Sequence, residues 1–208
     1  RVLSRHGYRA WLVGGSVRDL LLGRDVVDWD FATDARPEAV QAIFRRTIPT
    51  GVAHGTVTVC IQGHAFEVTT LRSEGGYSDQ RRPDSVVFED SIEKDLTRRD
   101  FTINAMALDI RASNLVDVTG GAQDLMDRVI RAVGEPAVRF REDALRLLRA
   151  ARFAAQLGCR IEPETKRAMA QEADGLRQVS RERVHDEVVK LMAAEDVERG
   201  LAALEETG

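Results

Sequence analysis

Residues 11–33 decide the fold of this chain and read WLVGGSVRDLLLGRDVVDWDFAT. The stretch opens inside an apolar strand that we place at residues 10–13, and it turns at Gly14 and Gly15. It continues as a helix over residues 16–22, because apolar side chains recur there at helical spacing. Backbone N–H groups at the start of a helix form an anion site, and glycine allows a phosphate to approach the backbone closely. The turn therefore predicts that Gly14 and Gly15 bind a nucleotide phosphate.

Two aspartates follow in a run otherwise suited to a buried strand, which we predict over residues 27–32. Side chains two residues apart share one face of a strand, so Asp28 and Asp30 point the same way, with Cα atoms roughly 7 Å apart. Like charges on one face repel each other, and a cation removes that repulsion. Carboxylates suit Mg²⁺, and paired metal ions can hold the attacking and leaving oxygens of a phosphoryl displacement. The pair predicts a metal site; the alternative is an edge strand with solubilising acids.

The neighbouring residues favour the metal site. Arg18 lies in the first turn of the predicted helix, where it can reach the same anion as the glycine turn. Glu67, in the alternating run AFEVTTL, is the candidate third acid on a neighbouring strand, either as a metal ligand or to polarise an attacking hydroxyl. The alternative for Glu67 is a solvent-facing strand residue. Together these residues predict a binding site for a nucleoside triphosphate and its metal ions.

The chain mixes strands and helices up to about Gly134. The runs GTVTVCI and AFEVTTL predict a hairpin, because β-branched residues alternate on both sides of a short glycine-containing loop. Residues 72–86 predict a loop, and Ser91 predicts the cap of a short helix. NAMALDI and LVDV predict a further pair of strands. Beyond Gly134 the strand signals disappear, and helices are predicted over residues 142–156, 163–173, 181–193 and 197–205.

These elements predict an α+β fold in two parts. The first, residues 1–134, is a catalytic head with a mixed or antiparallel sheet and flanking helices. The second, residues 135–208, is all-helical.

Composition is that of a globular protein, with 43% hydrophobic and 31% charged residues and a net charge of −4. No apolar run approaches the ~20 residues that span a bilayer, so no membrane partner is expected. Cys60 and Cys159 have no metal-ligand spacing, and two lone thiols are typical of a reduced, cytoplasmic protein. Arginines gather at residues 81–82, 98–99 and 139–152, where they either meet phosphates or form a solvated face. No pattern indicates the oligomeric state.

Seven segments, taken in order, look like the motifs of one family. They read LVGGSVRDLLLG, DWDFAT, FEVTTLR, YSDQRRPDSV, EKDLTRRDFTINAMALD, GEPAVRFREDALRLLRAARFAAQLG and SRERVHDEVVKLM. They resemble the class II branch of the polymerase-β-type nucleotidyltransferases, which comprises tRNA CCA-adding enzymes and bacterial poly(A) polymerases. The resemblance covers nearly the whole chain and is far more specific for the superfamily than for one activity. It implies ATP and CTP as substrates, two Mg²⁺ ions as cofactors and the 3′ end of tRNA as the RNA partner.

The same resemblance implies roles for individual residues. Gly15 and Arg18 would hold the triphosphate, and Asp28 and Asp30 would hold the two Mg²⁺ ions. Arg99 and Asp100 would contact the sugar or phosphates. It also implies that residues 135–208 are the neck and the start of a body, which recognise the nucleotide base and bind RNA. The residues that would contact the nucleotide from the first neck helix are Asp143, Arg146, Arg149 and Arg152.

Helical geometry narrows the neck group. On a helix over residues 142–156, at 100° per residue, Arg146 lies about 60° from Asp143, whereas Arg152 lies about 180° away. We therefore expect Asp143 and Arg146 to read the base. Arg149 and Arg152 are expected to serve phosphates or helix packing. Cytosine and adenine present an amino donor beside a ring-nitrogen acceptor, which a carboxylate and a guanidinium match; uracil and guanine reverse that order. The alternative for the pair is a salt bridge on an arginine-rich helix.

The sequence thus predicts a template-independent RNA nucleotidyltransferase that adds C and A to the 3′ end of tRNA. The loop over residues 73–83 is intact, which in this family favours competence to add A. An A-adding, CC-adding or poly(A)-adding enzyme shares the motifs and stays open as an alternative. A non-catalytic RNA- or nucleotide-binding module is the alternative from another class. Because family members continue into helices that grip tRNA, we expect residues 1–208 to be a catalytic-core fragment or the ordered part of a longer protein.

Overall fold

The computed structural model describes residues 1–75 and 85–208. Most of the predicted loop over residues 73–83, with its two arginines, lies outside the described residues. The described residues form two compact units: the first contains Arg1–Glu74, Val86–Arg99 and Ile103–Thr119, and the second contains Asp100–Thr102 and Gly120–Gly208. No helix in the described part of the chain is long and apolar enough to cross a membrane.

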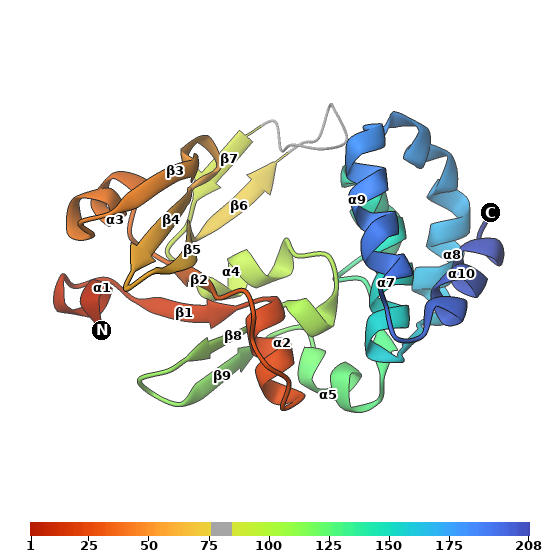
Figure 1. Ribbon diagram of the computed structural model, residues 1–208, viewed down its shortest axis with the longest axis horizontal. Coiled ribbons are helices and arrows are strands. Elements are labelled where there is room, and N and C mark those ends of the chain that lie inside the picture. The colour runs from red at the N-terminus through yellow and green to blue at the C-terminus, as the bar shows by residue number, and fades with distance from the viewer. Residues whose placement is uncertain (76–84) are drawn as a thin grey trace. The chain divides into compact units, whose positions relative to one another are not determined.

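The first unit is built on a mixed sheet that has seven strands among the described residues (Figure 1). In spatial order the strands are β3 (Thr47–Gly51), β4 (Thr56–Ile61), β5 (His64–Thr70), β2 (Asp30–Thr33), β1 (Ala10–Val13), β8 (Met106–Asp109) and β9 (Asn114–Asp117). Strands β2 and β5 pair in parallel, and the other neighbours pair antiparallel. The predicted hairpin is confirmed as β4 and β5.

Helices cover both faces of this sheet. The short helices of the first unit are α1 (Val2–Arg5), α2 (Gly15–Leu21), α3 (Pro37–Ile43), η1 (Val52–His54) and α4 (Ile92–Thr97). Helices α1 and α3 pack through Leu3 and Val40 on a core that contains Val57 and Val68. Helix α4 packs on the other face, where Leu96 joins the cluster of the β1 and β2 side chains. Helix α4 begins after Ser91, whose hydroxyl accepts from Lys94 N at 3.3 Å, as the capping signal predicts.

Two predictions for the first unit are corrected. Strand β2 begins at Asp30 rather than at residue 27, so Asp28 lies in a bend before the strand. Strand β1 pairs with residues 31–33 of β2 and ends at Val13. An earlier start of β2 would therefore have no β1 residues to pair with. The stretch 72–86 is not wholly a loop, because β6 (Arg72–Gly75) and β7 (Ser85–Phe88) form a two-stranded sheet.

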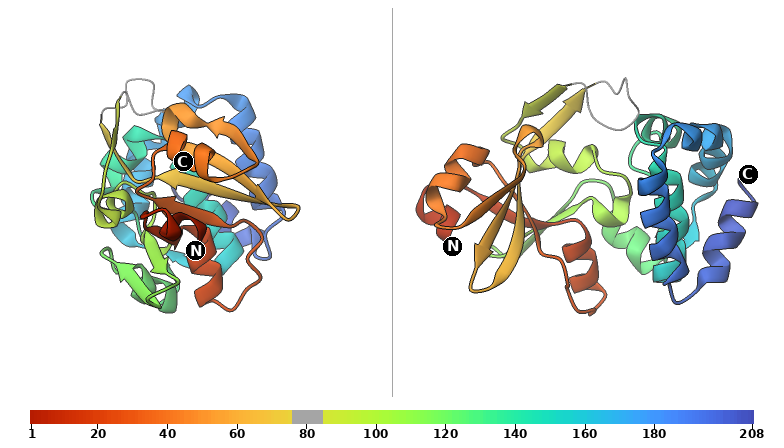
Figure 2. Two further views of the ribbon diagram at one scale, coloured as in Figure 1. Left: turned by 90° about the vertical axis from the view of Figure 1, so that its left-hand side faces the viewer. Right: turned by 45° about the horizontal axis from the view of Figure 1, so that its top comes forward.

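The second unit is mainly helical. Its elements are α5 (Gly121–Met126), β10 (Val129–Ile130), α6 (Pro136–Glu142), α7 (Leu145–Leu157), β11 (Arg160–Ile161), α8 (Pro163–Glu172), η3 (Ala173–Gln178), α9 (Arg181–Met192) and α10 (Val197–Glu205). Helix α7 packs beside α9, as Figure 1 and the right-hand view of Figure 2 show. Gly200 of α10 allows a close approach to α7, because a Cβ there would lie 3.0 Å from the carbonyl oxygen of Ala151.

The two short strands β10 and β11 pair in parallel and tie the segment before Gly134 to the helices that follow it. Apart from Asp100–Thr102, the second unit begins at Gly120, whereas a domain boundary near Gly134 stays a prediction.

The predicted helix over residues 142–156 is wrong at its start. Helix α6 ends at Glu142, Asp143 adopts an extended backbone with φ −152° and ψ 101°, and α7 begins at Leu145. Asp143 and Arg146 therefore do not share one continuous helix, and the angular spacing predicted for them does not apply.

Candidate nucleotide and metal site

The glycine turn of the first unit forms a cradle with Arg99 and Asp30. Gly14 caps α2 with φ +68°, a conformation that favours glycine. A Cβ on Gly14 would lie 3.0 Å from Arg99 Nη1 and 3.7 Å from Asp30 Oδ2. The backbone of the turn, the guanidinium of Arg99 and the carboxylate of Asp30 therefore border one small space that a larger side chain would fill.

Ser16 joins the glycine turn to the aspartates. Its hydroxyl, which is buried, donates to the carbonyl oxygen of Asp28 at 2.8 Å and accepts from Asp30 N at 2.9 Å. This single side chain holds both residues of the Asp-x-Asp pair against the first turn of α2. No spacing rule in the sequence points to such a role, because the contact depends on how the bend folds back.

Asp30 and Glu67 are register partners on the parallel strands β2 and β5, so their side chains share one face of the sheet. Burial, together with the charges of Glu67 and Asp28, raises the pKa of Asp30 to about 6, while the charge of Arg99 opposes the rise. Asp28 and Glu67 are both exposed. The structure thus places Asp28 and Glu67 in electrostatic reach of Asp30.

Among the described residues, no group of three His, Cys, Asp or Glu side chains is close enough to hold a metal ion by itself. Mg²⁺ usually keeps several waters and takes one or two carboxylates plus phosphate oxygens, so it does not need such a group. A carboxylate that burial and like charges make costly to ionise is relieved by a cation. The donor set of Asp28 and Asp30, with Glu67 beside it, therefore fits Mg²⁺ bound together with a triphosphate.

Arg18 is already paired in this structure, which the sequence does not indicate. Its Nε and Nη2 donate to the carboxylate of Asp19 at 2.8 and 2.9 Å, and its Nη1 donates to Asn104 Oδ1 at 2.8 Å. The guanidinium lies beside Gly15, whose added Cβ would be 3.5 Å from Arg18 Nη2. Arg18 is thus at the predicted place beside the turn, held by two side chains that sequence reasoning missed.

Arg99 lies between Asp30 and a buried acid, Asp95. Arg99 Nη2 donates to Asp95 Oδ2 at 3.1 Å, and its buried Nε has no hydrogen-bond partner in the described part of the chain. Asp95 is 1% exposed and also accepts from Arg98 Nη2 at 2.7 Å and from Arg72 N at 3.3 Å. Asp95 was missed, although its i,i+3 and i,i+4 spacing to the two arginines is a readable signal. The atom of Arg99 that borders Gly14 is Nη1, and a guanidinium in that place fits an anionic ligand.

In the second unit, Asp143 is bound by an unpredicted partner. Arg183 of α9 donates from Nη1 to Asp143 Oδ1 at 3.2 Å and from Nη2 to Oδ2 at 2.8 Å. Arg146 donates to Glu142 Oε2 at 2.6 Å and to the carbonyl oxygen of Arg139 at 2.8 Å. The two predicted base readers are therefore each held by their own protein partner, and the Arg183 contact spans forty residues of sequence.

Asp100 and Arg149 pair with each other. Arg149 donates from Nε and Nη2 to Asp100 Oδ2 at 2.9 and 2.6 Å, while Asp100 Oδ1 accepts from Phe101 N at 2.8 Å. Arg149 lowers the pKa of the buried Asp100 to about 2, because its charge and hydrogen bonds outweigh desolvation. Arg152 is buried and donates to Glu187 Oε2 at 2.6 Å, which agrees with the packing alternative for this residue.

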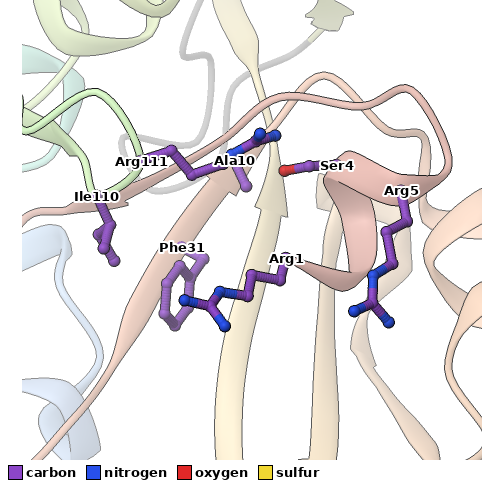
Figure 3. Close-up of a pocket in the computed structure, with 7 residues that line it drawn as sticks. All are labelled: Arg1, Ser4, Arg5, Ala10, Phe31, Ile110 and Arg111. Carbon is purple, nitrogen blue, oxygen red and sulfur yellow. The ribbon is translucent and has the colours of Figure 1, made fainter.

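A separate hollow of about 670 Å³ lies on the first unit (Figure 3). Ser4 and Arg5 of α1, Phe31 of β2 and Arg111 line it, and none of the predicted site residues does. Phe31 is adjacent to Asp30 in the strand, so its side chain points to the opposite face of the sheet. This hollow is therefore distinct from the candidate nucleotide site.

Two family models match this chain. A family model described as the poly A polymerase head domain matches residues 10–131, which is more than half of the chain. A second model, described as a probable RNA and SrmB-binding site of polymerase A, matches residues 158–208.

Curated relatives match the chain from end to end. A CCA-adding enzyme of Geobacillus thermodenitrificans is 51% identical over all 208 residues, and one of Lactobacillus johnsonii is 48% identical over 206 residues. The match covers 51% of the first relative and 52% of the second, so the chain spans about half the length of these relatives.

Solved structures match the fold. A crystal structure of the Bacillus stearothermophilus CCA-adding enzyme in complex with CTP has a TM-score of 0.92 and 48% identity, and the match covers 100% of this chain and 50% of that one. A tRNA nucleotidyltransferase complexed with a primer tRNA and an incoming ATP analog has a TM-score of 0.82 and 31% identity, with 99% and 59% covered. With the glycine cradle and the paired acids in place, this chain belongs to the poly(A) polymerase head-domain family of polymerase-β-type nucleotidyltransferases.

Proposed function

We propose that this chain is the catalytic part of a template-independent RNA nucleotidyltransferase that adds C and A to the 3′ end of tRNA. The observation that carries the proposal is the position of Asp30, opposite Glu67 on the sheet and beside the cradle formed by Gly14 and Arg99. Relatives named CCA-adding enzymes, and structures of such enzymes with CTP or tRNA, support the choice of substrates. The proposed compartment is the cytoplasm, where tRNA and nucleoside triphosphates are available.

In the proposed reaction the 3′-hydroxyl of the RNA attacks the α-phosphate of CTP or ATP. A phosphodiester bond forms, the bond between the α-phosphate and the bridging oxygen breaks, and pyrophosphate leaves; the hydroxyl proton passes to a nearby carboxylate or water. The residues that bind the triphosphate are Gly14, Gly15, Arg18 and Arg99, and contact of the sugar or phosphates with Asp100 is part of the proposal. When bound to Asp28 and Asp30, two Mg²⁺ ions would neutralise the charge that develops on the phosphoryl oxygens.

Selection of the base is assigned to the second unit. Asp143 would accept the exocyclic amino proton of cytosine or adenine, and Arg146 would donate to the adjacent ring nitrogen. A uracil or guanine would leave buried polar groups unsatisfied, at a cost of about 1–3 kcal/mol for each. Both residues are held by other side chains in this structure, so the base competes with these partners or joins them.

The decisive experiment is incorporation of labelled nucleotides into tRNA transcripts that end at the discriminator base, at -C or at -CC. The expected product from mixed CTP and ATP ends in -CCA, and formation requires Mg²⁺. The Asp30→Asn variant should abolish incorporation, whereas an exposed control such as Asp25→Asn should keep it. Incorporation that survives the loss of Asp30 and the removal of Mg²⁺ contradicts the proposal.

The same primers separate the alternatives within the family. A-only extension of the -CC primer indicates an A-adding enzyme, CC-only extension of the shortest primer indicates a CC-adding enzyme, and a long A tail indicates a poly(A) polymerase. Nucleotide or RNA binding with no incorporation indicates the non-catalytic module.

A further inference from the structure

The carboxylate of Asp143 is held in one orientation by an arginine from a different helix. Asp143 lies in the extended break between α6 and α7, and its Oδ1 accepts from Leu145 N at 3.1 Å. Arg183 of α9 approaches as a fork, 3.2 Å from Oδ1 and 2.8 Å from Oδ2. From this geometry, and resting on the proposed function, we infer that Arg183 is the positioning residue that makes Asp143 selective for cytosine and adenine.

The hydrogen-bond inventory shows why the fork matters. A carboxylate offers about four lone-pair sites, two on each oxygen. In the described residues Oδ1 of Asp143 accepts two hydrogen bonds and Oδ2 accepts one. The remaining acceptor site is on Oδ2, so this is the oxygen that would receive an amino proton from the base. A fork of two parallel N–H groups also sets the plane of the carboxylate, which a single contact does not.

The pair is placed to meet a ligand rather than only to hold the helices together. The side chains of Arg183 and Asp143 are 24% and 16% exposed, so solvent and small molecules reach them. Helix α9 already has a buried anchor on α7, because Arg152 Nε donates to Glu187 Oε2 at 2.6 Å one turn further along α9. Packing of α9 therefore does not depend on Arg183 alone.

Position and chemistry together distinguish Arg183 from its neighbours on the helix. Arg181 is exposed at the start of α9, and Glu187 faces the buried guanidinium of Arg152. Only donors surround the carboxylate of Asp143 in the contacts described, so both of its oxygens remain acceptors. That is the property needed to receive an amino group and to reject the carbonyl group of uracil or guanine.

The test compares Arg183→Met and Arg183→Lys with Arg181→Met, an exposed arginine on the same helix. The measured quantity is the ratio of kcat/KM for CTP or ATP to kcat/KM for UTP or GTP, on primers that accept each nucleotide. Arg183→Met should lower this ratio at least tenfold while the melting temperature stays close to that of the parent chain. Arg183→Lys should give an intermediate ratio because it offers no fork, and Arg181→Met should leave the ratio unchanged.

The outcomes separate this inference from the proposed function. A folded Arg183→Met variant that keeps the parental ratio overturns the inference alone. If Arg183→Met does not fold, the lysine variant decides, and an unchanged ratio there has the same meaning. A parent chain that incorporates no nucleotide, or all four equally, overturns the proposed function and with it the inference.

Discussion

Asp30 and Glu67 lie opposite each other on the parallel strands β2 and β5, with both carboxylates on the same face of the sheet. Burial and the charge of Glu67 raise the pKa of Asp30 to about 6, well above the ordinary value of 3.8. Stability and function make opposite demands on this pair, because two acids brought together without a cation destabilise the fold.

Replacing Glu67 with Gln should lower the pKa of Asp30 and stabilise the metal-free chain. A carboxyl whose pKa is raised in the folded state costs stability above that pKa, and the cost disappears as the pH falls from about 6 toward 3.8. With allowance for solvent screening, the gain at pH 7.5 should be about 1 kcal/mol. Carboxyl NMR titration of Asp30 and thermal unfolding in EDTA measure both effects.

The control for Glu67→Gln is Asp25→Asn, which removes one exposed negative charge elsewhere in the first unit. It should leave the titration of Asp30 where it is. An unchanged Asp30 titration in Glu67→Gln would show that the two carboxylates do not interact.

Replacing Gly14 with Ala should disrupt both the turn and the site. The backbone has φ +68°, and the new Cβ would lie 3.0 Å from Arg99 Nη1. We expect a loss of about 1–3 kcal/mol in the free energy of unfolding and a loss of nucleotide affinity. Urea unfolding and titration with CTP measure these. Gly23→Ala is the matched control, because its φ is +66° with nothing within 4 Å of the added Cβ. Equal losses of CTP affinity in the two variants would contradict a role for the Gly14 cradle.

Replacing Ser16 with Ala should destabilise the fold and also release Asp28 and Asp30 from the first turn of α2. The hydroxyl bridges Asp28 O and Asp30 N, so its loss leaves two backbone groups unpaired and costs about 1–3 kcal/mol. We also expect weaker Mg²⁺-dependent stabilisation of the chain, measured as the shift in melting temperature between EDTA and Mg²⁺ with CTP.

Thr33→Val provides a close match for Ser16→Ala. The Thr33 hydroxyl also bridges a carbonyl and an amide, donating to Arg9 O at 2.6 Å and accepting from Ala35 N at 3.2 Å. It lies on the same strand at the far end from Asp30. Thr33→Val should therefore destabilise the fold by a similar amount and leave the Mg²⁺ response intact. Loss of that response in both variants would argue against a specific role of the Ser16 hydroxyl in holding the aspartates.

Replacing Asp100 with Asn should destabilise the second unit in a pH-dependent way. Arg149 holds the pKa of Asp100 at about 2, below the ordinary value of 3.8. Because the pKa of Asp100 is lower in the folded chain than in the unfolded chain, its stabilisation is complete above about pH 4 and is lost as the pH falls through 2. We expect a loss on the order of 2 kcal/mol at pH 7 that shrinks below pH 3, measured by urea unfolding at several pH values.

Asp174→Asn is the control for Asp100→Asn. Asp174 pairs with Arg177 at 3.3 Å, but both side chains are more than 80% exposed. Exposed pairs of this kind contribute about 0–1 kcal/mol, so this change should be nearly neutral at every pH. A pH-independent loss for Asp100→Asn would mean that its ion pair with Arg149 is not the source of the stability.

Much of the fold was readable because local patterns and tertiary structure agree. Alternation in GTVTVCI and AFEVTTL predicted the β4–β5 hairpin, and the turn at Gly14 and Gly15 predicted the strand and helix on either side of it. The same alternation placed Glu67 on the opposite face from Val68, which is why a candidate third acid could be named before its partner strand was known.

The errors occurred where pairing or capping overrides local preference. Residues 27–29 look like strand, but β1 is too short to pair with them. Residues 142–156 look like one helix, yet the backbone opens at Asp143, whose carboxylate accepts from Leu145 N instead of pointing along a helix face.

From the sequence alone we could name the chemical groups: a glycine turn at a helix start, an Asp-x-Asp pair and, through the family resemblance, Asp143 and Arg146 as predicted base readers. The tertiary structure alone decided how these groups are held. Ser16 binds the backbone of Asp28 and Asp30, Asp95 holds Arg99 beside Gly14, and Arg183 orients Asp143. The physical reason is that local motifs follow from backbone geometry over a few residues, whereas these supporting contacts join side chains that meet only after the chain has folded.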